Sequence, residues 1–196
     1  MNKKIYALIT LFAIMVAFAS CGNDDNEEEY KRTLAWKELN DKIYDDAAAT
    51  GEYRKLLSGT GNGEVLYKTS SVIVSPRLIE ITDTPPLFTD SVVCRYIGWY
   101  FDENLEKVTF DSTESEDGNN GGLGTGFRVN GVVPGWTDIL QTMNIGDERE
   151  ICLPYMLGYG SAGLTSGTTT IIPAYTTLFF NIKLLKVYRK QTSADN

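Results

Sequence analysis

The chain has 196 residues, enough for one ordinary domain and an additional segment, and its 42% hydrophobic content is sufficient for a packed core. Its formal charge of -8 argues against a nucleic-acid-binding protein, because that class needs a basic surface to contact phosphates. The sequence contains no histidine, which excludes a Ser-His-Asp triad, a Cys-His pair and a histidine metal site. Any catalysis must therefore use carboxylates, tyrosines, backbone amides or the shape of a pocket.

Residues 1–20 are typical of an export signal. Two lysines precede an apolar run over residues 5–18, which is short for a membrane span, and small residues follow that run. Residues 18–21 read Phe-Ala-Ser-Cys and resemble a bacterial lipobox, which predicts cleavage before Cys21 and attachment of a lipid to that cysteine. An uncleaved anchor helix and ordinary secretion are the alternatives.

A short polar segment, residues 21–29, follows the signal. Five of its last six residues are carboxylates, and it has too little apolar surface to fold, so we expect a solvated acidic tether. An acidic run directly after the cysteine resembles the surface-export signal of Bacteroides-type lipoproteins. The expected location is the cell envelope, with the protein lipid-anchored to the outer membrane. The sequence leaves open whether it faces the periplasm or the surface.

Residues 30–75 are predicted to form an N-terminal helical segment and a linker. The apolar stripe of the helix, expected over residues 30–49, consists of Trp36, Leu39, Ile43 and Ala47. Residues 64–68 favour a short strand. One apolar stripe indicates contact with a domain core, so the segment is interpreted as a spacer or cap, with a dimerisation arm as the alternative.

Residues 76–190 are predicted to form the main domain, followed by a disordered tail over residues 191–196. The segments expected to form strands are 91–97, 148–153 and 178–188, and the first and third show the alternation of a strand. A short helix is expected to begin at Pro134. Its apolar face comprises Trp136, Ile139, Leu140 and Met143. Several strands and one short helix predict an α+β domain in which the helix packs on an antiparallel sheet.

Four further stretches carry a recognisable pattern. They are Val-Val-Cys-Arg-Tyr-Ile-Gly at 92–98, Phe-Asp-Ser-Thr at 110–113, Phe-Arg-Val and Val-Val-Pro-Gly-Trp within 127–136, and Leu-Pro, Gly-Tyr-Gly, Ile-Ile-Pro and Thr-Leu-Phe-Phe within 153–180. In this order they resemble the FKBP-type peptidyl-prolyl cis-trans isomerases. The resemblance implies an FKBP-like antiparallel sheet wrapped around one short α-helix. It also implies an enzyme that assists the folding of exported proteins.

The resemblance assigns residues to a pocket for proline-containing polypeptides. The expected lining is Tyr96, Phe110, Phe127, Val132, Trp136, Ile172 and Phe180. The Tyr159 hydroxyl and the Val133 amide would hold substrate carbonyls, and Asp111 would orient a hydroxyl at the rim. Macrolide inhibitors of the family are further expected ligands, and neither a cofactor nor a metal is implied. Periodicity alone would assign these aromatic residues to plain core packing.

A dry aromatic pocket could catalyse prolyl isomerisation without acid–base chemistry, because excluding water favours the twisted amide over the planar, dipolar form. A non-catalytic peptide-binding module, chaperone or adhesin on the same fold is the alternative. Every pocket candidate lies beyond Ser91, so residues 30–70 are expected to be dispensable for turnover.

Some features depart from the family pattern or suggest other chemistry. The loops 114–126 and 161–170 are unusual, and Tyr175 stands where the family often has His or Asn, which affects the expected peptide preference. The acidic residues after position 113 are interpreted as a solvated turn rather than a cation site. Strand alternation places Cys94 and Cys152 on opposite faces, so both are expected to remain free thiols.

The lipobox leads to a direct test. Cys21→Ala should abolish labelling of the protein by a fatty acid and should release it from the membrane fraction, because the lipid is attached to that sulfur. Unchanged labelling of the variant would contradict the lipoprotein interpretation.

Overall fold

The computed structural model describes residues 25–71, 84–114 and 124–189. The predicted signal peptide, Cys21, the tail over residues 191–196 and most of the loop over residues 114–126 lie outside these ranges. Within the described ranges, no helix combines the length and the apolar character that crossing a membrane requires.

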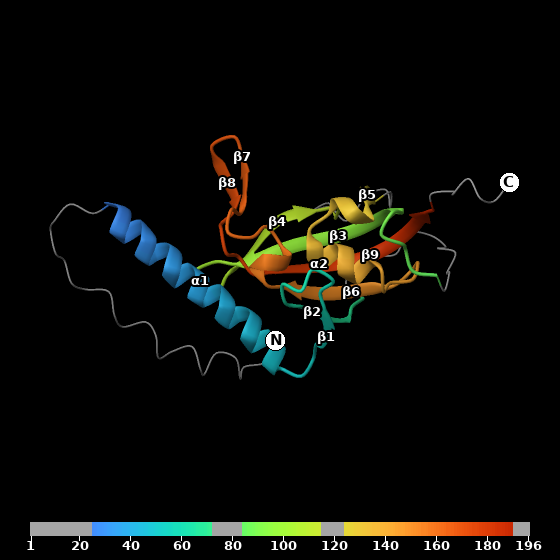
Figure 1. Ribbon diagram of the computed structural model, residues 1–196, viewed down its shortest axis with the longest axis horizontal. Helices are drawn as coiled ribbons and strands as arrows, with labels where there is room; N and C mark the ends of the chain where they lie inside the picture. The colour runs from blue at the N-terminus through green and yellow to red at the C-terminus, as the bar shows by residue number, and fades with distance from the viewer. Residues whose placement is uncertain (1–24, 72–83, 115–123, 190–196) are drawn as a thin grey trace.

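The described chain forms helices and strands in the order shown in Figure 1. They are α1 (Asp25–Ala49), β1 (Arg54–Leu57), β2 (Glu64–Thr69), β3 (Ser91–Phe101), β4 (Lys107–Ser112), β5 (Thr125–Arg128), the 3-10 helix η1 (Val129–Gly131), α2 (Pro134–Leu140), β6 (Glu148–Leu153), the 3-10 helix η2 (Tyr155–Leu157), β7 (Leu164–Ser166), β8 (Thr169–Ile172) and β9 (Leu178–Tyr188). The strands predicted at 148–153 and 178–188 are confirmed at both ends.

Seven strands form one antiparallel sheet in the order β1-β2-β6-β9-β3-β4, and β5 pairs with β3. The long strands β3 and β9 lie side by side at its centre and are paired over most of their lengths. Strands β7 and β8 form a separate hairpin that projects from the body of the molecule (Figure 1). The predicted α+β fold, an antiparallel sheet with one short helix packed on it, is confirmed.

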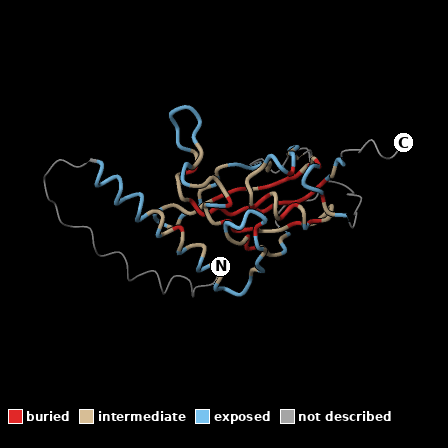
Figure 2. The backbone as a smooth tube through the Cα atoms, viewed as in Figure 1, coloured by how far each residue is buried: buried red, intermediate tan, exposed pale blue. Residues whose placement is uncertain are grey.

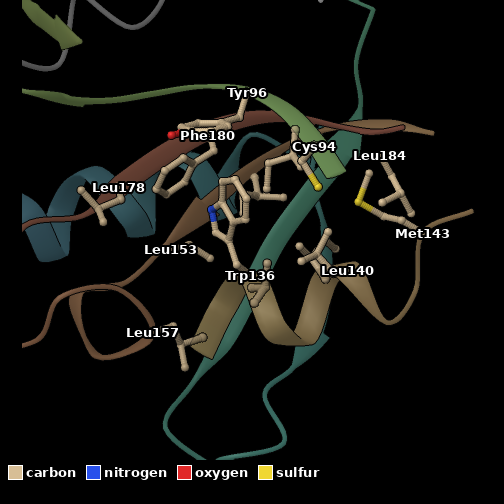
Figure 3. Packing of buried hydrophobic residues seen from close by; sticks show 14 of the residues in the cluster. Cys94, Tyr96, Trp136, Leu140, Met143, Leu153, Leu157, Leu178, Phe180 and Leu184 are labelled. Atoms are coloured by element: carbon tan, nitrogen blue, oxygen red, sulfur yellow. The ribbon is translucent and has the colours of Figure 1, made fainter. Parts of the chain in front are cut away.

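The main hydrophobic core lies between α2 and one face of the sheet. Trp136, Ile139 and Leu140 on α2 are buried against strand residues that point to this face, as Figure 3 shows for Trp136 and Leu140. The α-helix ends at Leu140, earlier than its predicted apolar face, although Met143 beyond it is fully buried in the same core. A helix of seven residues is too short to be stable alone, so α2 depends on this packing.

Helix α1 covers the opposite face of the sheet. Its residues Ile43, Tyr44 and Ala47 pack on a second cluster that contains Leu66, Trp99, Cys152 and Phe179. The helix therefore packs on the domain, as expected for a cap, and the dimerisation alternative stays a prediction. Its first turns are exposed, whereas the strands and α2 hold most of the buried chain (Figure 2).

The helix begins at Asp25 and not at residue 30, so the end of the predicted tether is helical. Carboxylates are favourable in the first turns of a helix because they face the positive end of its dipole. Glu27 also pairs with Lys31 one turn later, at 2.7 Å. The acidic composition that suggested a solvated tether therefore also suits the start of a helix.

The structure corrects the predicted boundary at residue 75. Strand β2 pairs with β6 inside the main sheet, and β1 extends the sheet beyond β2. Val65 belongs to the core on the α2 side and Leu66 to the cluster under α1, and both are fully buried. Residues 54–69 are therefore part of the domain and not a linker, and a chain that begins after them would lack two strands of the main sheet. Whether residues 30–70 are dispensable for turnover stays a prediction.

The two cysteines occupy opposite faces of the sheet, as predicted. Cys94 lies in the core beside α2 and Cys152 lies under α1, and both are free and buried. Burial raises the pKa of each thiol well above its ordinary value, because the thiolate would lose its hydration. Both sulfurs are therefore inert packing groups under neutral conditions.

The integration of β2 can be tested by comparing two leucines of the same segment. Leu66→Ala should lower the free energy of unfolding by about 2–5 kcal/mol, because it leaves a cavity between the sheet and α1. Leu57→Ala is the matched control, since that side chain is 71% exposed and its loss should change stability by less than about 0.5 kcal/mol. Equal effects in denaturant titrations would show that β2 is peripheral.

Candidate active site

The residues predicted to form the pocket come from six parts of the fold and meet at one end of the main core. Their sources are β3 (Tyr96), β4 (Phe110 and Asp111), β5 (Phe127), the start of α2 (Val132, Val133 and Trp136), the segment after η2 (Tyr159), and the β8–β9 region (Ile172 and Phe180). All except Asp111 belong to the core cluster or pack against it. Asp111 joins through a hydrogen bond to Tyr96, which itself contacts the rings of Phe127 and Trp136.

Aromatic rings surround the indole of Trp136. Its ring centroid lies 5.2 Å from that of Tyr96, 5.5 Å from that of Phe127 and 5.2 Å from that of Phe180. The interplanar angles of 85°, 70° and 83° make all three contacts edge-to-face, the arrangement that aromatic quadrupoles favour. Figure 3 shows Tyr96, Trp136 and Phe180 together in the core.

The fifth ring, Phe110, extends this cluster toward the rim. Its centroid lies 5.5 Å from that of Phe180, again nearly perpendicular at 89°. Trp136 and Phe180 are each only 4% exposed, whereas Phe110 and Phe127 are half-buried. The cluster therefore has a buried floor and a partly exposed wall. Among the described residues, no protein group accepts a hydrogen bond from the buried indole Nε1 of Trp136.

Gly98 makes room for two of these rings. A Cβ at this position would lie 2.7 Å from Phe110 Cζ and 2.8 Å from Phe180 Cε1, closer than carbon atoms can approach. Sequence reasoning did not assign Gly98 to the site, although the Tyr-x-Gly pattern of the strand contained the signal. Gly135 has a similar role under α2, where a Cβ would lie 2.3 Å from Leu153 Cδ2. The helix therefore approaches β6 closely.

A hydrogen bond connects the cluster to its polar rim. The Tyr96 hydroxyl donates to Asp111 Oδ2 at 2.6 Å, and the Tyr96 backbone N–H donates to Thr113 Oγ1 at 2.8 Å. Burial, assisted by the neighbouring carboxylate of Asp111, raises the pKa of the Tyr96 phenol. Burial and then the same carboxylate also raise the pKa of Tyr159. Both phenols therefore stay protonated at neutral pH, and the one hydroxyl proton of Tyr96 is used in its bond to Asp111.

The remaining predicted residues frame this arrangement. Val133 directly precedes α2, and its carbonyl accepts hydrogen bonds from the backbone N–H groups of Trp136 and Thr137 at 2.9 and 3.1 Å. Ile172 ends β8 and is 1% exposed, so it belongs to the core more than to the rim. Tyr159 and Val132 are half-buried. The site thus combines apolar walls with a few polar groups at one edge.

The unusual loop over residues 161–170 contains most of the β7–β8 hairpin, whose tip from Thr165 to Thr170 is exposed. Tyr175, which follows the hairpin, adopts a left-handed backbone conformation with φ 62°. Its ring lies 5.2 Å from that of Tyr155. Within the described ranges, no group of three or more Cys, Asp or Glu side chains is arranged to hold a metal ion.

Residues 83–185 match the family described as FKBP-type peptidyl-prolyl cis-trans isomerase. The FKBP-type 22 kDa peptidyl-prolyl cis-trans isomerase of Escherichia coli is 34% identical over 102 residues, which cover 52% of this chain and 43% of that protein. The FKBP-type isomerase FkpA of Escherichia coli is 31% identical over 157 residues, covering 80% of this chain and 52% of that protein. The chain thus spans about half the length of these relatives.

A solved structure supports the same fold. The crystal structure of FkpA from Escherichia coli superposes with a TM-score of 0.59 at 23% sequence identity, covering 83% of this chain and 63% of that one. At this identity the likeness concerns the arrangement of the helices and strands.

The space at Gly98 predicts a specific sensitivity. Gly98→Ala should lower the free energy of unfolding by about 1–3 kcal/mol, because the new methyl group forces Phe110 and Phe180 apart. Gly126→Ala is the control in a neighbouring strand, since the nearest atom to its Cβ is 4.0 Å away. Similar stabilities of the two variants in urea titrations would show that the ring contacts at Gly98 are not tight.

Proposed function

The chain belongs to the FKBP-type peptidyl-prolyl cis-trans isomerase family, and we propose that it catalyses the isomerisation of prolyl peptide bonds in exported proteins. The observation that carries the proposal is the ring cluster around Trp136, a dry apolar floor beside the Tyr96–Asp111 pair. That combination offers a proline ring an apolar surface and offers the adjoining backbone a few hydrogen-bonding groups.

The reaction needs no bond to be made or broken. Rotation about an amide faces a barrier of about 18–20 kcal/mol because resonance stabilises the planar form. The two isomers of an X-Pro bond therefore exchange only over tens to hundreds of seconds. Resonance places charge on the amide oxygen, and twisting the bond reduces that charge separation. An environment without water thus stabilises the twisted amide relative to the planar one.

Each part of the site has a role in this proposal. The proline ring would lie on the indole of Trp136, between the walls formed by Tyr96, Phe110, Phe127 and Phe180. The Tyr159 hydroxyl and the Val133 amide would hold the carbonyl groups next to the rotating bond. Asp111 would act through Tyr96, because its carboxylate fixes the direction of that hydroxyl. These contacts orient the substrate, while exclusion of water lowers the barrier.

The partners and location follow from the same premise and from the N-terminal sequence. We propose proline-containing polypeptides as substrates and macrolides of the kind that inhibit this family as ligands of the same pocket. We further propose that a lipid on Cys21 anchors the protein in the outer membrane of the cell envelope. The lipobox-like residues 18–21 and the apolar run before them support this location.

Two substitutions separate orientation from desolvation. Tyr159→Phe and Asp111→Val remove polar groups at nearly constant volume, and each should lower kcat/KM for a proline peptide about ten- to a hundredfold. Neither should abolish activity, because no proton transfer depends on them. Tyr188→Phe is the control, a matched loss of a hydroxyl at a ring that is 57% exposed, and it should leave kcat/KM unchanged.

The pH profile tests the same account. Because the pKa of both Tyr96 and Tyr159 is raised above the ordinary tyrosine value of 10, neither phenol ionises between pH 6 and 8. We expect kcat/KM to vary little over that range. A bell-shaped profile through neutrality, or complete loss of activity in folded Asp111→Val, would indicate acid–base catalysis instead. Binding of proline peptides without any turnover would favour the non-catalytic alternative.

A further inference from the structure

Helix α1 is hydrogen-bonded to the turn over residues 173–177, which separates β8 from β9. Asn40 is the fully buried residue of the helix that makes this connection. Its side-chain Oδ1 accepts a hydrogen bond from the Thr177 backbone N–H at 2.8 Å, and its backbone carbonyl accepts one from Thr177 Oγ1 at 2.9 Å. Its Nδ2 donates to the Trp36 carbonyl at 2.9 Å, which fixes the orientation of the amide.

Trp36, one turn earlier, bonds to the same turn from its other side. Its indole Nε1 donates to the Ala174 carbonyl at 2.9 Å and lies 3.3 Å from Thr176 Oγ1. Thr176 Oγ1 in turn donates to the Pro173 carbonyl at 2.7 Å. Two helix residues therefore form hydrogen bonds with residues 174, 176 and 177 of this five-residue turn.

The same turn is joined directly to the site. It follows Ile172, and the Tyr175 backbone N–H donates to the Gly160 carbonyl at 3.0 Å, next to Tyr159. The left-handed backbone of Tyr175 is uncommon for a residue with a side chain, so this conformation needs support from its surroundings. The bonds from α1 on either side of Tyr175 supply that support.

A second connection runs through aromatic rings. The Trp36 ring lies edge-to-face on Tyr100 with centroids 6.3 Å apart, and Tyr100 stacks on Phe110 at 6.4 Å. Phe110 is a wall of the pocket and contacts Phe180. Movement of Trp36 would therefore reach the site both through the turn and through this wall.

The chemistry of Asn40 indicates that the contact is specific. Asparagine is a poor residue for the interior of a helix, and a buried amide is unfavourable unless it is hydrogen-bonded. An apolar side chain there would leave the buried Thr177 N–H unpaired, which costs more than a net hydrogen bond contributes. The bonds can form at only one register of the helix on the turn, so they define its position.

We propose that Trp36 and Asn40 are positioning residues for the isomerase site, through which α1 sets the placement of Ile172 and Tyr159 and so the preference for residues flanking the proline. This inference rests on the proposed isomerase function. It assigns to a helix on the far face of the sheet, outside the matched residues 83–185, a part in substrate selection. Loss of the bonds allows the turn to move.

The test uses the full chain with two substitutions and a matched control. Trp36→Phe removes the indole donor but keeps a ring, and Asn40→Leu removes the amide at similar volume. Tyr44→Phe removes a hydrogen bond of the same kind, 2.9 Å to the Glu64 carbonyl, from the same helix to β2 and not to the turn. The readout is kcat/KM for a series of proline peptides that differ only in the residue before the proline.

Trp36→Phe and Asn40→Leu should lower kcat/KM by about three- to tenfold, and by unequal factors across the peptides, whereas Tyr44→Phe should match the wild type. If the two residues had a purely structural role, kcat/KM would fall by the same factor for every peptide or would not change. If Asn40→Leu does not fold, Trp36→Phe carries the same test. Unchanged peptide preference in a folded Trp36→Phe protein would overturn the proposal.

Backbone amide NMR shifts of Tyr159 and Ile172 give a readout that needs no activity. They should change in Trp36→Phe and stay unchanged in Tyr44→Phe, and no change in either variant would overturn the inference. If the wild type is inactive and Trp36→Phe still changes these shifts, the isomerase function is refuted but the positioning by α1 is supported. If the wild type is active and Trp36→Phe changes neither the shifts nor the peptide preference, only the positioning role is refuted.

Discussion

The burial of Trp136 against the sheet is the constraint on which the rest of the structure depends. Helix α2 has only seven residues, so it exists because its indole and the neighbouring apolar side chains are held by the sheet. The close approach needs Gly135 on the helix, and the surrounding rings need Gly98 on β3. The ring cluster and the main core are thus one structure. Substitutions in the floor of the site will change stability and activity together.

The polar groups are arranged around this constraint at the rim. Asp111 is exposed, so its charge stays hydrated, and its carboxylate accepts the hydrogen bond that orients the hydroxyl of the buried Tyr96 ring. The raised pKa values of Tyr96 and Tyr159 keep both phenols neutral at pH 7, with the Tyr96 hydroxyl donating to Asp111. A site that lowers the barrier by excluding water needs groups of this kind, which orient carbonyls without bringing charge into the pocket.

The sequence predicted the parts of the fold that have a clear period and the parts of the site that match a family. Strand β9 has an apolar residue at every second position from Leu178 to Leu184, and all ten site residues came from motifs at fixed positions. Strand β2 was missed as part of the domain because Val65 and Leu66 are buried on opposite faces, which removes the alternation of a half-buried strand. The contacts of Asn40 and the role of Gly98 depend on distances between segments that are far apart in the chain. The periodicity of a sequence carries no information about such distances.

The central claim is that isomerisation proceeds in a dry pocket without proton transfer, and a solvent isotope effect tests it most directly. The measurement is kcat/KM for a proline peptide in H2O and in D2O, at matched positions of the flat pH range. The account predicts a ratio of about 1, because no bond to hydrogen changes in the rate-limiting step. A ratio well above about 2 would show a proton in flight in the transition state and would contradict catalysis by desolvation.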